Sequence, residues 1–446
     1  MATFSNMIDS ILKPFQRFGV HLGLERIQQL LANLGNPHIS VPVIHVAGTN
    51  GKGSVCAYLS SVLTQAGYRV GRYTSPHLVD WTERICLNEQ PISPEQLQQL
   101  LLQVQDAIRP EQELPTQFEV ITAAAWLYFA QSRVDIAVVE VGLGGRLDAT
   151  NVCERPEVSI ITSISREHWQ HLGPTLADIA REKAGILKPG CPAVVGPLPP
   201  AAEAVVRERI KALNCPDFWP EPALDLRTPQ ADAGWRWASY QGIEYPLPLQ
   251  GAMQLTNSAL AIATLQILQQ LRWDISTEAI ATGMAKTSWH GRLEWTTWQN
   301  HQLLIDGAHN PAAALALRQY IDTLDIQSIT WVIGMLSTKD HADIFRALLR
   351  PAERLYIVPV PDHSSAEPIE LATLAHNICP NLEDCHTYSN LFTALKAAIA
   401  YPQNLSDNQN HLRPSTSISV SKNLIILCGS LYLVGHFLQT AQTQSL

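Results

Sequence analysis

In the first part of the chain, near-continuous apolar runs alternate with segments in which apolar residues recur at helical spacing. Four such runs predict strands, at residues 41–47, 68–74, 134–141 and 158–164. The last two are rich in β-branched residues, which is typical of strands covered on both faces. Apolar residues at three- and four-residue spacings predict helices at residues 55–66, 94–108, 119–131, 175–188 and 254–271. This alternation predicts a parallel sheet with flanking helices.

A second alternating series begins near residue 298. It predicts strands at 303–306, 328–335, 355–360 and 424–428, and helices at 311–324, 340–349 and 389–401. Between the two series, tryptophans, prolines and short alternating runs at 212–250 indicate a small β-rich insertion. A polar stretch at 402–418 indicates a disordered surface loop. We therefore expect an α/β protein with two domains, residues 1–297 and a smaller Rossmann-like domain at 298–446.

A glycine-rich segment, GTNGKGS at 48–54, follows the first predicted strand and precedes the first predicted helix. Glycines let backbone N–H groups face a phosphate, the helix N-terminus supplies positive potential, and Lys52 neutralises charge. The strict spacing G-x-x-x-x-G-K-[ST] is not met, because Gly53 separates Lys52 from Ser54. The first domain is thus predicted to bind a mononucleotide through a variant phosphate loop.

Polar side chains follow the predicted strands where ligands bind in open parallel sheets. They are Ser54, Ser75, Glu140 and His168. Hydroxyl, carboxylate and imidazole groups together suit a divalent cation that bridges nucleotide phosphates. A strand-end glutamate is more often a solvated surface residue, and a single histidine is more often structural. The hypothesis of a metal site therefore depends on all four converging.

Lys183 lies on the apolar face of the helix predicted at 175–188, together with Leu176, Ile179 and Ala180. An inward lysine costs desolvation energy unless it snorkels, pairs with an anion or is modified. A buried neutral amine can add carbon dioxide and become a carbamate, which is an anionic metal ligand. A snorkelling or ion-paired lysine is the alternative.

Composition narrows the class of protein. The chain has 446 residues, 46% of them apolar, and a formal net charge of −9, which argues against a nucleic-acid-coating protein. Its eight cysteines form no C-x-x-C pair, so we expect reduced thiols in a cytoplasmic protein. The longest apolar stretch, residues 121–130, is too short to span a bilayer.

Several motifs in order resemble the folylpolyglutamate synthase/dihydrofolate synthase family, which belongs with the Mur ligases. They are GTNGKGS at 48–54, TSPHL at 74–78, GLGGRLDATN at 142–151, EKAGI at 182–186, HGRLE at 290–294, DGAHNP at 306–311 and GSLY at 429–432. The resemblance runs from about residue 20 to 435. GTNGKGS alone is typical of the whole Mur superfamily, whereas GLGGRLDATN is specific to the folate branch.

The resemblance implies an ATP site, a metal site and two substrate sites. The ATP site would comprise Asn50, Gly51, Lys52, Gly53, Ser54, Asn257, Arg292 and Asp306, with Arg292 and Asp306 reaching in from the interdomain edge. Two Mg²⁺ ions would be held by Ser54, Ser75, Glu140, His168 and carbamylated Lys183. The pterin pocket would comprise Thr116, Gln117, Phe118, Glu119, Leu147, Asp148 and Ala149, and His309 and Ser430 would bind glutamate. The catalytic residues would be Lys52, Lys183, Asp306 and His309.

Two positions depart from the family pattern. Glu167 stands before His168 where the family commonly has Asp, and His21 stands before LGLER where Asp is frequent. The resemblance implies a monomer that binds ATP, L-glutamate and dihydropteroate or a reduced folate, without nucleic acid or membrane partners. ATP would phosphorylate a substrate carboxylate, and the amine of glutamate would attack the acyl phosphate.

Two other functions remain open at this point. A Mur-type ligase acting on a UDP-muramoyl precursor would share the loop and the lysine, although the loop at residue 48 leaves little room for a separate N-terminal domain. A non-catalytic nucleotide-binding protein is the other alternative, but all the proposed metal ligands are present. The sequence does not decide between the dihydropteroate and reduced folate substrates.

Overall fold

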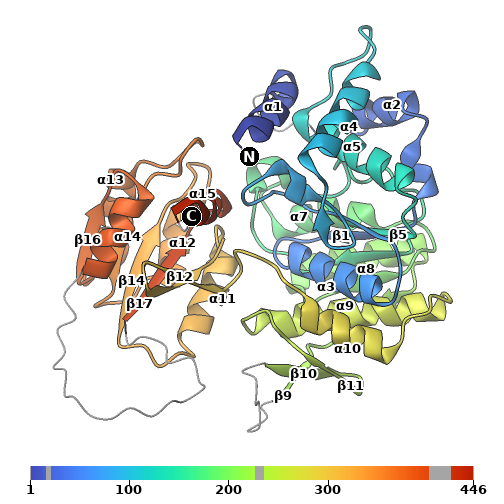
Figure 1. The fold of residues 1–446 in the computed structure, drawn as a ribbon. Coiled ribbons are helices and arrows are strands. Elements are labelled where there is room, and N and C mark those ends of the chain that lie inside the picture. Colours follow the sequence, from blue (N-terminus) through green and yellow to red (C-terminus); the bar gives the residue numbers. More distant parts are fainter. Residues whose placement is uncertain (1, 17–21, 227–235, 401–422, 445–446) are drawn as a thin grey trace. The chain divides into compact units, whose positions relative to one another are not determined.

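The computed structural model describes residues 2–16, 22–226, 236–400 and 423–444 (Figure 1). His21 and the loop predicted at 402–418 lie outside the described residues. The described chain forms two compact units. One comprises residues up to 289 except 249–252, and the other comprises 249–252 and residues from 290 onward.

The first unit contains an eight-stranded sheet with the order β4-β3-β2-β5-β1-β6-β7-β8. Its strands are β1 (Val43–Ala47), β2 (Val70–Tyr73), β3 (Ile85–Leu87), β4 (Gln90–Pro91), β5 (Ile136–Glu140), β6 (Val158–Ile161), β7 (Ala193–Val195) and β8 (Asp217–Phe218). The strands from β2 to β8 in this order are parallel, and β3 and β4 extend the sheet by antiparallel pairing. The expected mostly parallel sheet is confirmed.

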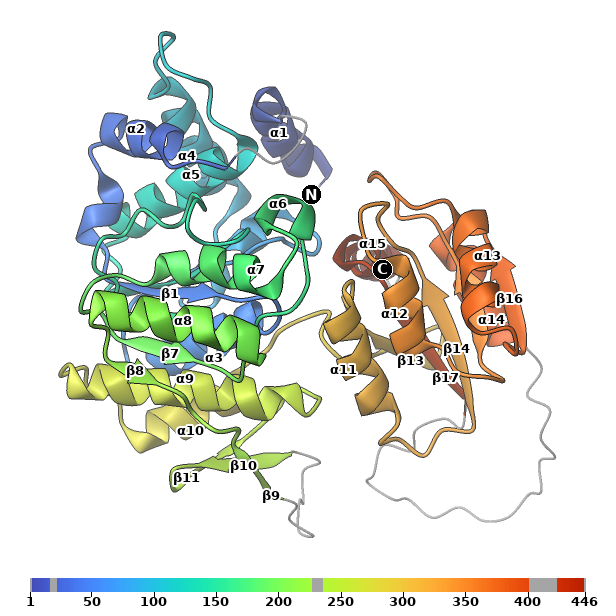
Figure 2. The ribbon, with the colours of Figure 1, turned by 180° about the vertical axis from the view of Figure 1, so that it is seen from behind.

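Helices cover both faces of this sheet (Figures 1 and 2). The helices of the first unit are α1 (Ala2–Leu12), α2 (Glu25–Asn33), α3 (Lys52–Gln65), α4 (Pro94–Asp106), α5 (Gln117–Gln131), α6 (Trp169–Leu172), α7 (Leu176–Lys183), α8 (Pro200–Leu213), α9 (Met253–Gln270) and α10 (Thr277–Lys286). Helix α3 packs against β1, β2 and β5 and against α9 and α10, whereas α7 packs against α8. The β-rich insertion forms a small antiparallel sheet of β9 (Leu224–Leu226), β10 (Trp237–Tyr240) and β11 (Ile243–Pro246).

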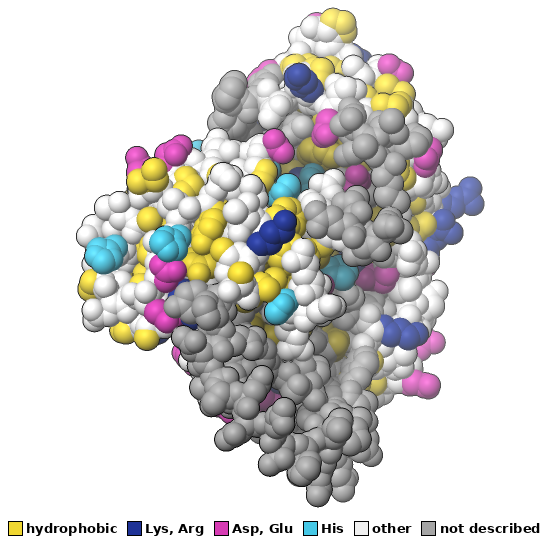
Figure 3. Space-filling view, turned by 60° about the vertical axis from the view of Figure 1, so that its left-hand side comes forward, with side chains coloured by type: hydrophobic (Ala, Val, Ile, Leu, Met, Phe, Trp, Pro, Cys, Tyr) yellow, Lys and Arg dark blue, Asp and Glu magenta, His cyan; other side chains and the backbone are white. Residues whose placement is uncertain are grey.

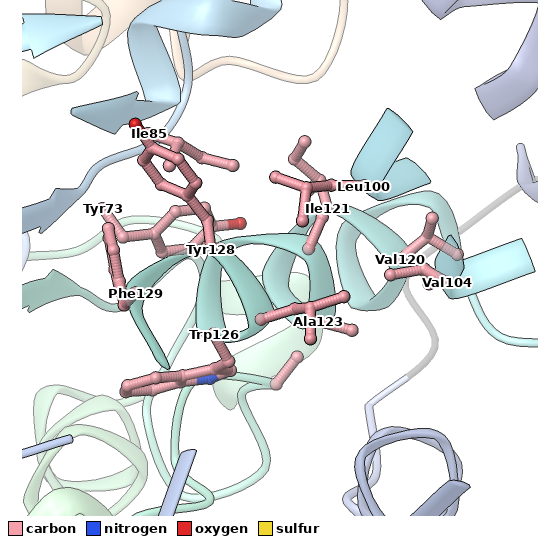
Figure 4. Close-up of a cluster of buried hydrophobic side chains, with 14 of the residues drawn as sticks. Tyr73, Ile85, Leu100, Val104, Val120, Ile121, Ala123, Trp126, Tyr128 and Phe129 are labelled. Carbon is pink, nitrogen blue, oxygen red and sulfur yellow. The ribbon is translucent and has the colours of Figure 1, made fainter. Parts of the chain in front are cut away.

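Helix α5 runs through a large cluster of buried apolar side chains (Figure 4). Almost all of its residues are buried, which explains why its sequence is apolar on every side. Trp126 and Phe129 meet edge to face at 6.4 Å, and Leu100 and Val104 of α4 pack on the same cluster. This core fixes the start of α5 beside the carboxyl end of the sheet.

The second unit contains a six-stranded sheet with the order β12-β13-β17-β14-β15-β16. Its strands are β12 (Glu294–Trp298), β13 (His301–Ile305), β14 (Ser328–Ile333), β15 (Arg354–Ile357), β16 (Asp384–Thr387) and β17 (Asn423–Cys428). Its helices are α11 (Pro311–Ile321), α12 (His341–Leu348), α13 (Pro368–Ile378), α14 (Leu391–Ala400) and α15 (Leu431–Gln444). Only β12 is antiparallel to its neighbour, so the expected second α/β sheet is confirmed.

The helix predicted at 175–188 is shorter than expected. Thr175 caps its start by accepting a hydrogen bond from the N–H of Asp178, but α7 ends at Lys183 and continues only as a 3₁₀ turn, Ala184–Ile186. At Gly185 a side chain would meet the backbone of Arg146 at 2.5 Å, so the chain must accommodate another loop here. Packing between distant segments therefore ends the helix.

The surface charges, the cysteines and the apolarity of the helices can each be compared with the expectations from the sequence. On the face shown in Figure 3, charged side chains of both signs are scattered among uncharged ones. All eight cysteines are free, and only Cys385 is more than slightly exposed. Across the described ranges, none of the helices combines the length and apolarity that a membrane span requires.

Candidate active site

Four adjacent strands of the first sheet bring the predicted site residues to one edge. The order β2-β5-β1-β6 is continuous and parallel, so the carboxyl ends of all four strands lie side by side. Ser75 follows β2, Glu140 ends β5, and the phosphate loop follows β1. Thr162 and Ser163 follow β6. The edge is therefore the place where this fold holds ligands.

The end of β6 holds the phosphate loop in shape. The carbonyl of Asn50 accepts hydrogen bonds from Thr162 Oγ1 at 2.7 Å and from Ser163 Oγ at 3.0 Å. Ser163 Oγ also accepts from the N–H of Asn50 at 3.0 Å. The sequence analysis did not identify Thr162 or Ser163, although two hydroxyl residues at the end of a buried strand are a readable signal.

At two positions of the loop, neighbouring side chains leave no room for any residue larger than glycine. Gly51 has φ +88°, and a side chain there would collide with the amide of Asn257. At Gly53 a side chain would meet the indole of Trp289 at 2.5 Å. Asn257 lies on α9 and donates to Gln254 Oε1 at 3.0 Å. The predicted nucleotide residue Asn257 therefore lies against the loop.

Gln254 connects α9 to the start of α3. Its amide Nε2 donates to Ser54 Oγ at 3.3 Å. Ser54, which is predicted to bind a metal, is buried in the first turn of α3. Gln254 lies one helical turn before Asn257, so it shares a face with a residue that the sequence did indicate.

Lys52, Glu140 and Ser75 form a group at the edge. Lys52 Nζ donates to the carbonyl of Thr49 at 3.1 Å and lies 3.9 Å from Glu140 Oε1. The other carboxylate oxygen of Glu140 accepts from the N–H of Ser75 at 3.3 Å. Glu140 is only 5% exposed, and its two neighbours, Lys52 and the N–H of Ser75, partly offset its negative charge. The carboxylate of Glu140 and the hydroxyls of Ser54 and Ser75 form a donor set that fits Mg²⁺.

Lys183 is buried, as its position on the apolar face of α7 predicts. It is 5% exposed, and its Nζ donates to the carbonyl of Gly48 at 2.7 Å. Burial, and next the charge of Lys52, lower the pKa of Lys183 to about 7, whereas Glu167 and Asp148 oppose this shift. A substantial fraction of the amine is therefore neutral at physiological pH, which carbamate formation requires.

His168 begins the short helix α6 with φ +50°. Its Nε2 lies 3.8 Å from the carboxylate of Glu167, the residue that departs from the family pattern. In the described part of the chain, no group of three or more His, Cys, Asp and Glu residues could by itself hold a metal ion. The predicted site contains only Glu140 and His168 of those types, and its other members are hydroxyls and Lys183.

The start of α5 contains the segment predicted to line the pterin pocket. Thr116 and Glu119 form a reciprocal cap, in which the N–H of Thr116 donates to Glu119 Oε2 at 2.6 Å. Arg26 also donates to the buried Glu119 carboxylate at 3.0 Å. Phe118 lies against Gly142, and Gln117 is the first residue of the helix. Glu119 is thus already bound by groups of the chain itself.

Asp148 organises the GLGGRLDATN loop. Its Oδ2 accepts from the N–H of Leu143 at 2.8 Å, and its Oδ1 accepts from the N–H of Thr150 at 3.0 Å. Burial raises the pKa of Asp148, while these hydrogen bonds act in the opposite direction. Leu147 accepts at its carbonyl from Gly23 N–H, and Ala149 is buried beside Asp148.

The remaining predicted residues belong to the second unit. Asp306 follows β13 and accepts from the N–H groups of Leu293 and Ala308 at 2.8 and 2.7 Å; burial raises its pKa and the charge of Arg292 opposes this shift. His309 Nδ1 lies 2.7 Å from the carbonyl of Gly307. Ser430 follows the neighbouring strand β17 and is buried. Asp306 and Ser430 thus lie after adjacent parallel strands.

Comparisons with known proteins first define the class. Residues 46–195 match the family described as Mur ligase middle domain, and this range contains the phosphate loop, Glu140 and Lys183. Residues 291–440 match the family described as Dihydrofolate synthetase, C-terminal domain. The N-terminal unit is therefore that of a Mur-type ligase.

Full-length similarity then identifies the branch. The chain is 35% identical over 441 residues to dihydrofolate synthetase of Saccharomyces cerevisiae, covering 94% of this chain and 98% of the relative. Mycobacterium tuberculosis folylpolyglutamate synthase, solved with ADP and AMPPCP, has a TM-score of 0.84 and 30% identity, with 98% of each chain covered. Escherichia coli FolC in complex with DHPP and ADP has a TM-score of 0.81 and 28% identity over 99% and 98% of the two chains.

This chain belongs to the dihydrofolate synthase/folylpolyglutamate synthase family, as its motifs predict. It is an ATP-dependent ligase of the folate–glutamate class. The expected α/β fold is confirmed, and the match to this structure covers 98% of the chain. The roles assigned above to single residues stay predictions.

Proposed function

We propose that this chain joins L-glutamate to dihydropteroate, with ATP as the energy source. The observation that carries this proposal is that α7 contacts two loops at once. Lys183 donates to Gly48 of the phosphate loop, and the N–H of Arg146 in GLGGRLDATN donates to the carbonyl of Glu182 at 2.8 Å. The ATP site and the pteroate site that the family motifs indicate are therefore neighbours.

Adjacent sites suit transfer of the γ-phosphoryl group to the substrate carboxylate. The bond between the γ-phosphorus and ADP breaks, a carboxylate oxygen bonds to phosphorus, and an acyl phosphate forms. The α-amine of glutamate then attacks the acyl carbon, phosphate leaves, and the amine loses a proton as the amide forms. Two anions approach in the first step, so positive charge from Lys52 lowers its barrier.

Mg²⁺ is the metal we propose for this site, held by Ser54, Ser75, Glu140 and His168. When bound, it supplies charge neutralisation for the transferred phosphoryl group. The oxygen-rich donor set around Glu140 supports magnesium over softer metals. Asn50, Gly51 and Gly53 present the loop to the phosphates, and Asn257 supports the loop from α9.

Carbamylation of Lys183 is part of this proposal. The neutral amine forms a nitrogen–carbon bond with carbon dioxide and releases a proton, which leaves an anionic carbamate. The lowered pKa of Lys183 favours this reaction, because only the unprotonated amine is nucleophilic. The carbamate would hold the second of two Mg²⁺ ions through an oxygen. A mass increase of one carboxyl group on the intact protein, lost on acidification, tests it.

In the second unit, we propose that Arg292 and Asp306 contact the nucleotide and that His309 and Ser430 bind glutamate. The placement of Asp306 and Ser430 after the neighbouring strands β13 and β17 supports a shared ligand edge in this sheet. We also propose that the protein acts as a monomer, which a molar mass from light scattering would check.

Dihydropteroate is favoured over a reduced folate because residues 291–440 match the family described as Dihydrofolate synthetase, C-terminal domain, and because two relatives named dihydrofolate synthetase match 94% and 93% of this chain. The test is ADP release by purified protein with ATP, glutamate and one acceptor at a time: dihydropteroate, tetrahydrofolate or a UDP-muramoyl peptide. We expect ADP with dihydropteroate. Activity with tetrahydrofolate as well makes the enzyme bifunctional, and activity with the muramoyl peptide alone overturns the proposal.

A further inference from the structure

His45 lies in the middle of β1 and has no part in the site described so far. It is 1% exposed and is flanked in the sheet by Val139 of β5 and Ser159 of β6. Its Nε2 lies 2.9 Å from Thr150 Oγ1 in the GLGGRLDATN loop. Its Nδ1 is one of the few buried polar atoms in the described residues for which the structure gives no hydrogen-bond partner. A buried imidazole with a single partner needs an explanation.

The direction of the hydrogen bonds follows from Thr150. Its hydroxyl donates to Asp148 Oδ1 at 2.5 Å, and a hydroxyl has only one hydrogen to give. Thr150 Oγ1 must therefore accept from His45, which fixes His45 as the neutral tautomer with hydrogen on Nε2. The resulting chain runs from His45 through Thr150 to Asp148. Asp148 in turn accepts from the N–H of Leu143, which lies at the other end of the same loop.

The neighbouring charges favour this arrangement. Burial, and next the charge of Lys188, oppose protonation of His45, so the ring stays neutral. Asp148 is buried and accepts hydrogen bonds from Leu143 N–H and Thr150 N–H in addition to the Thr150 hydroxyl. These donors hold an ionised carboxylate in one orientation.

We propose that His45 is a positioning residue for the pteroate site: its Nε2–H fixes the Thr150 hydroxyl on Asp148 and so sets the shape of the 142–150 loop. Without this donor, the hydroxyl of Thr150 is free to rotate, and Asp148 loses one of the bonds that hold it between the two ends of the loop. The phosphate loop leaves the same strand but makes no use of this chain of bonds. This inference rests on the proposed function, because the 142–150 loop is assigned there to pteroate.

The test compares KM for dihydropteroate with KM for ATP in matched pairs of variants. Thr150→Val removes the hydroxyl at nearly constant volume, and Thr150→Ser keeps it. His45→Leu removes the donor, and His45→Gln keeps an N–H at a similar reach. We expect Thr150→Val and His45→Leu to raise KM for dihydropteroate about tenfold, the scale of one hydrogen bond to a charged group, with less than a twofold change for ATP. Ser and Gln should recover most of the affinity.

The double variant His45→Leu/Thr150→Val separates positioning from general damage to the core. If His45 acts through Thr150, the double variant is no worse than Thr150→Val alone. Thr264→Val is the control, because Thr264 is equally buried and bonds only to Leu260 of its own helix α9. Should the two losses multiply, or KM for ATP rise equally, the inference is wrong.

A failure of the proposed function looks different from a failure of this inference. If wild-type protein releases no ADP with dihydropteroate, the function itself is wrong. If wild type is active and Thr150→Val leaves its KM for dihydropteroate unchanged, only the role of His45 is refuted. Thr150→Val also decides the matter if His45→Leu does not fold, since it changes the core least.

Discussion

The buried, neutral His45 makes the first unit sensitive to acid. Its pKa is lowered to about 3 from a usual value of 6.5, first by burial and then by the charge of Lys188. Below pH 6.5 the unfolded chain takes up a proton that the native chain does not bind until about pH 3. Native stability is therefore lost as pH falls from 6.5 towards 3, and the linkage relation gives a loss of about 2 kcal/mol at pH 5.

The perturbation is His45→Gln, which keeps an N–H donor and removes the titrating ring. The free energy of unfolding is measured by urea titration at pH 8 and at pH 5 for both proteins. We expect the drop between the two pH values to be about 2 kcal/mol smaller in the variant. Ser159→Ala removes a buried hydroxyl on the neighbouring strand and no titrating group, so it should show the wild-type drop. Equal drops for wild type and His45→Gln would refute the reasoning.

Three further predictions concern the lysine, the loop and the second unit. Lys183→Ala should lower kcat by about a hundredfold or more in a coupled ADP assay, and a short carboxylic acid should restore part of it, because the variant cannot form the proposed carbamate. Gly53→Ala should raise KM for ATP about tenfold in the same assay, because the new methyl group meets Trp289 at 2.5 Å. Arg318→Met should lower the free energy of unfolding by about 3 kcal/mol in urea titrations, because Glu353 stays buried without its cation.

A specific result would contradict each of these three predictions. Wild-type turnover in Lys183→Ala would show that the mechanism does not need the lysine. An unchanged KM for ATP in Gly53→Ala would show that the close contact with Trp289 does not limit ATP binding. For Arg318→Met the control is Arg181→Ala, which removes an exposed ion pair with Asp178 and should leave the free energy of unfolding almost unchanged. Similar losses in the two variants would contradict the assigned energy of the buried pair.

What the sequence predicted well depends on local geometry. The spacing of Leu176, Ile179 and Ala180 placed Lys183 on a buried face, and the structure confirms its burial because helical periodicity needs no knowledge of distant segments. The loop between β1 and α3 is local in the same sense. Its glycines indicate from the sequence alone that the backbone of the loop has no room for side chains. The structure shows that Asn257 and Trp289 occupy that space.

What the sequence missed depends on contacts between distant segments. His45 sits inside an apolar run that we interpreted only as a strand, and its partner Thr150 is 105 residues away. The end of α7 is set by packing of Gly185 on Arg146, which periodicity does not register. Thr116 and Glu119 have the spacing of a capping box, so the cap at the start of α5 is a signal that the sequence contains.

The position of β5 between β1 and β2 has a consequence for biosynthesis. As the nascent chain leaves the ribosome, β1 and β2 both emerge well before β5, so neither can pair early with the strand that separates them. Glu140 ends that late strand, and it is the group that Lys52 and Ser75 approach. The carboxylate of Glu140 thus reaches Lys52 and Ser75 only once the middle of the sheet closes, and a chain truncated before β5 lacks this group of contacts.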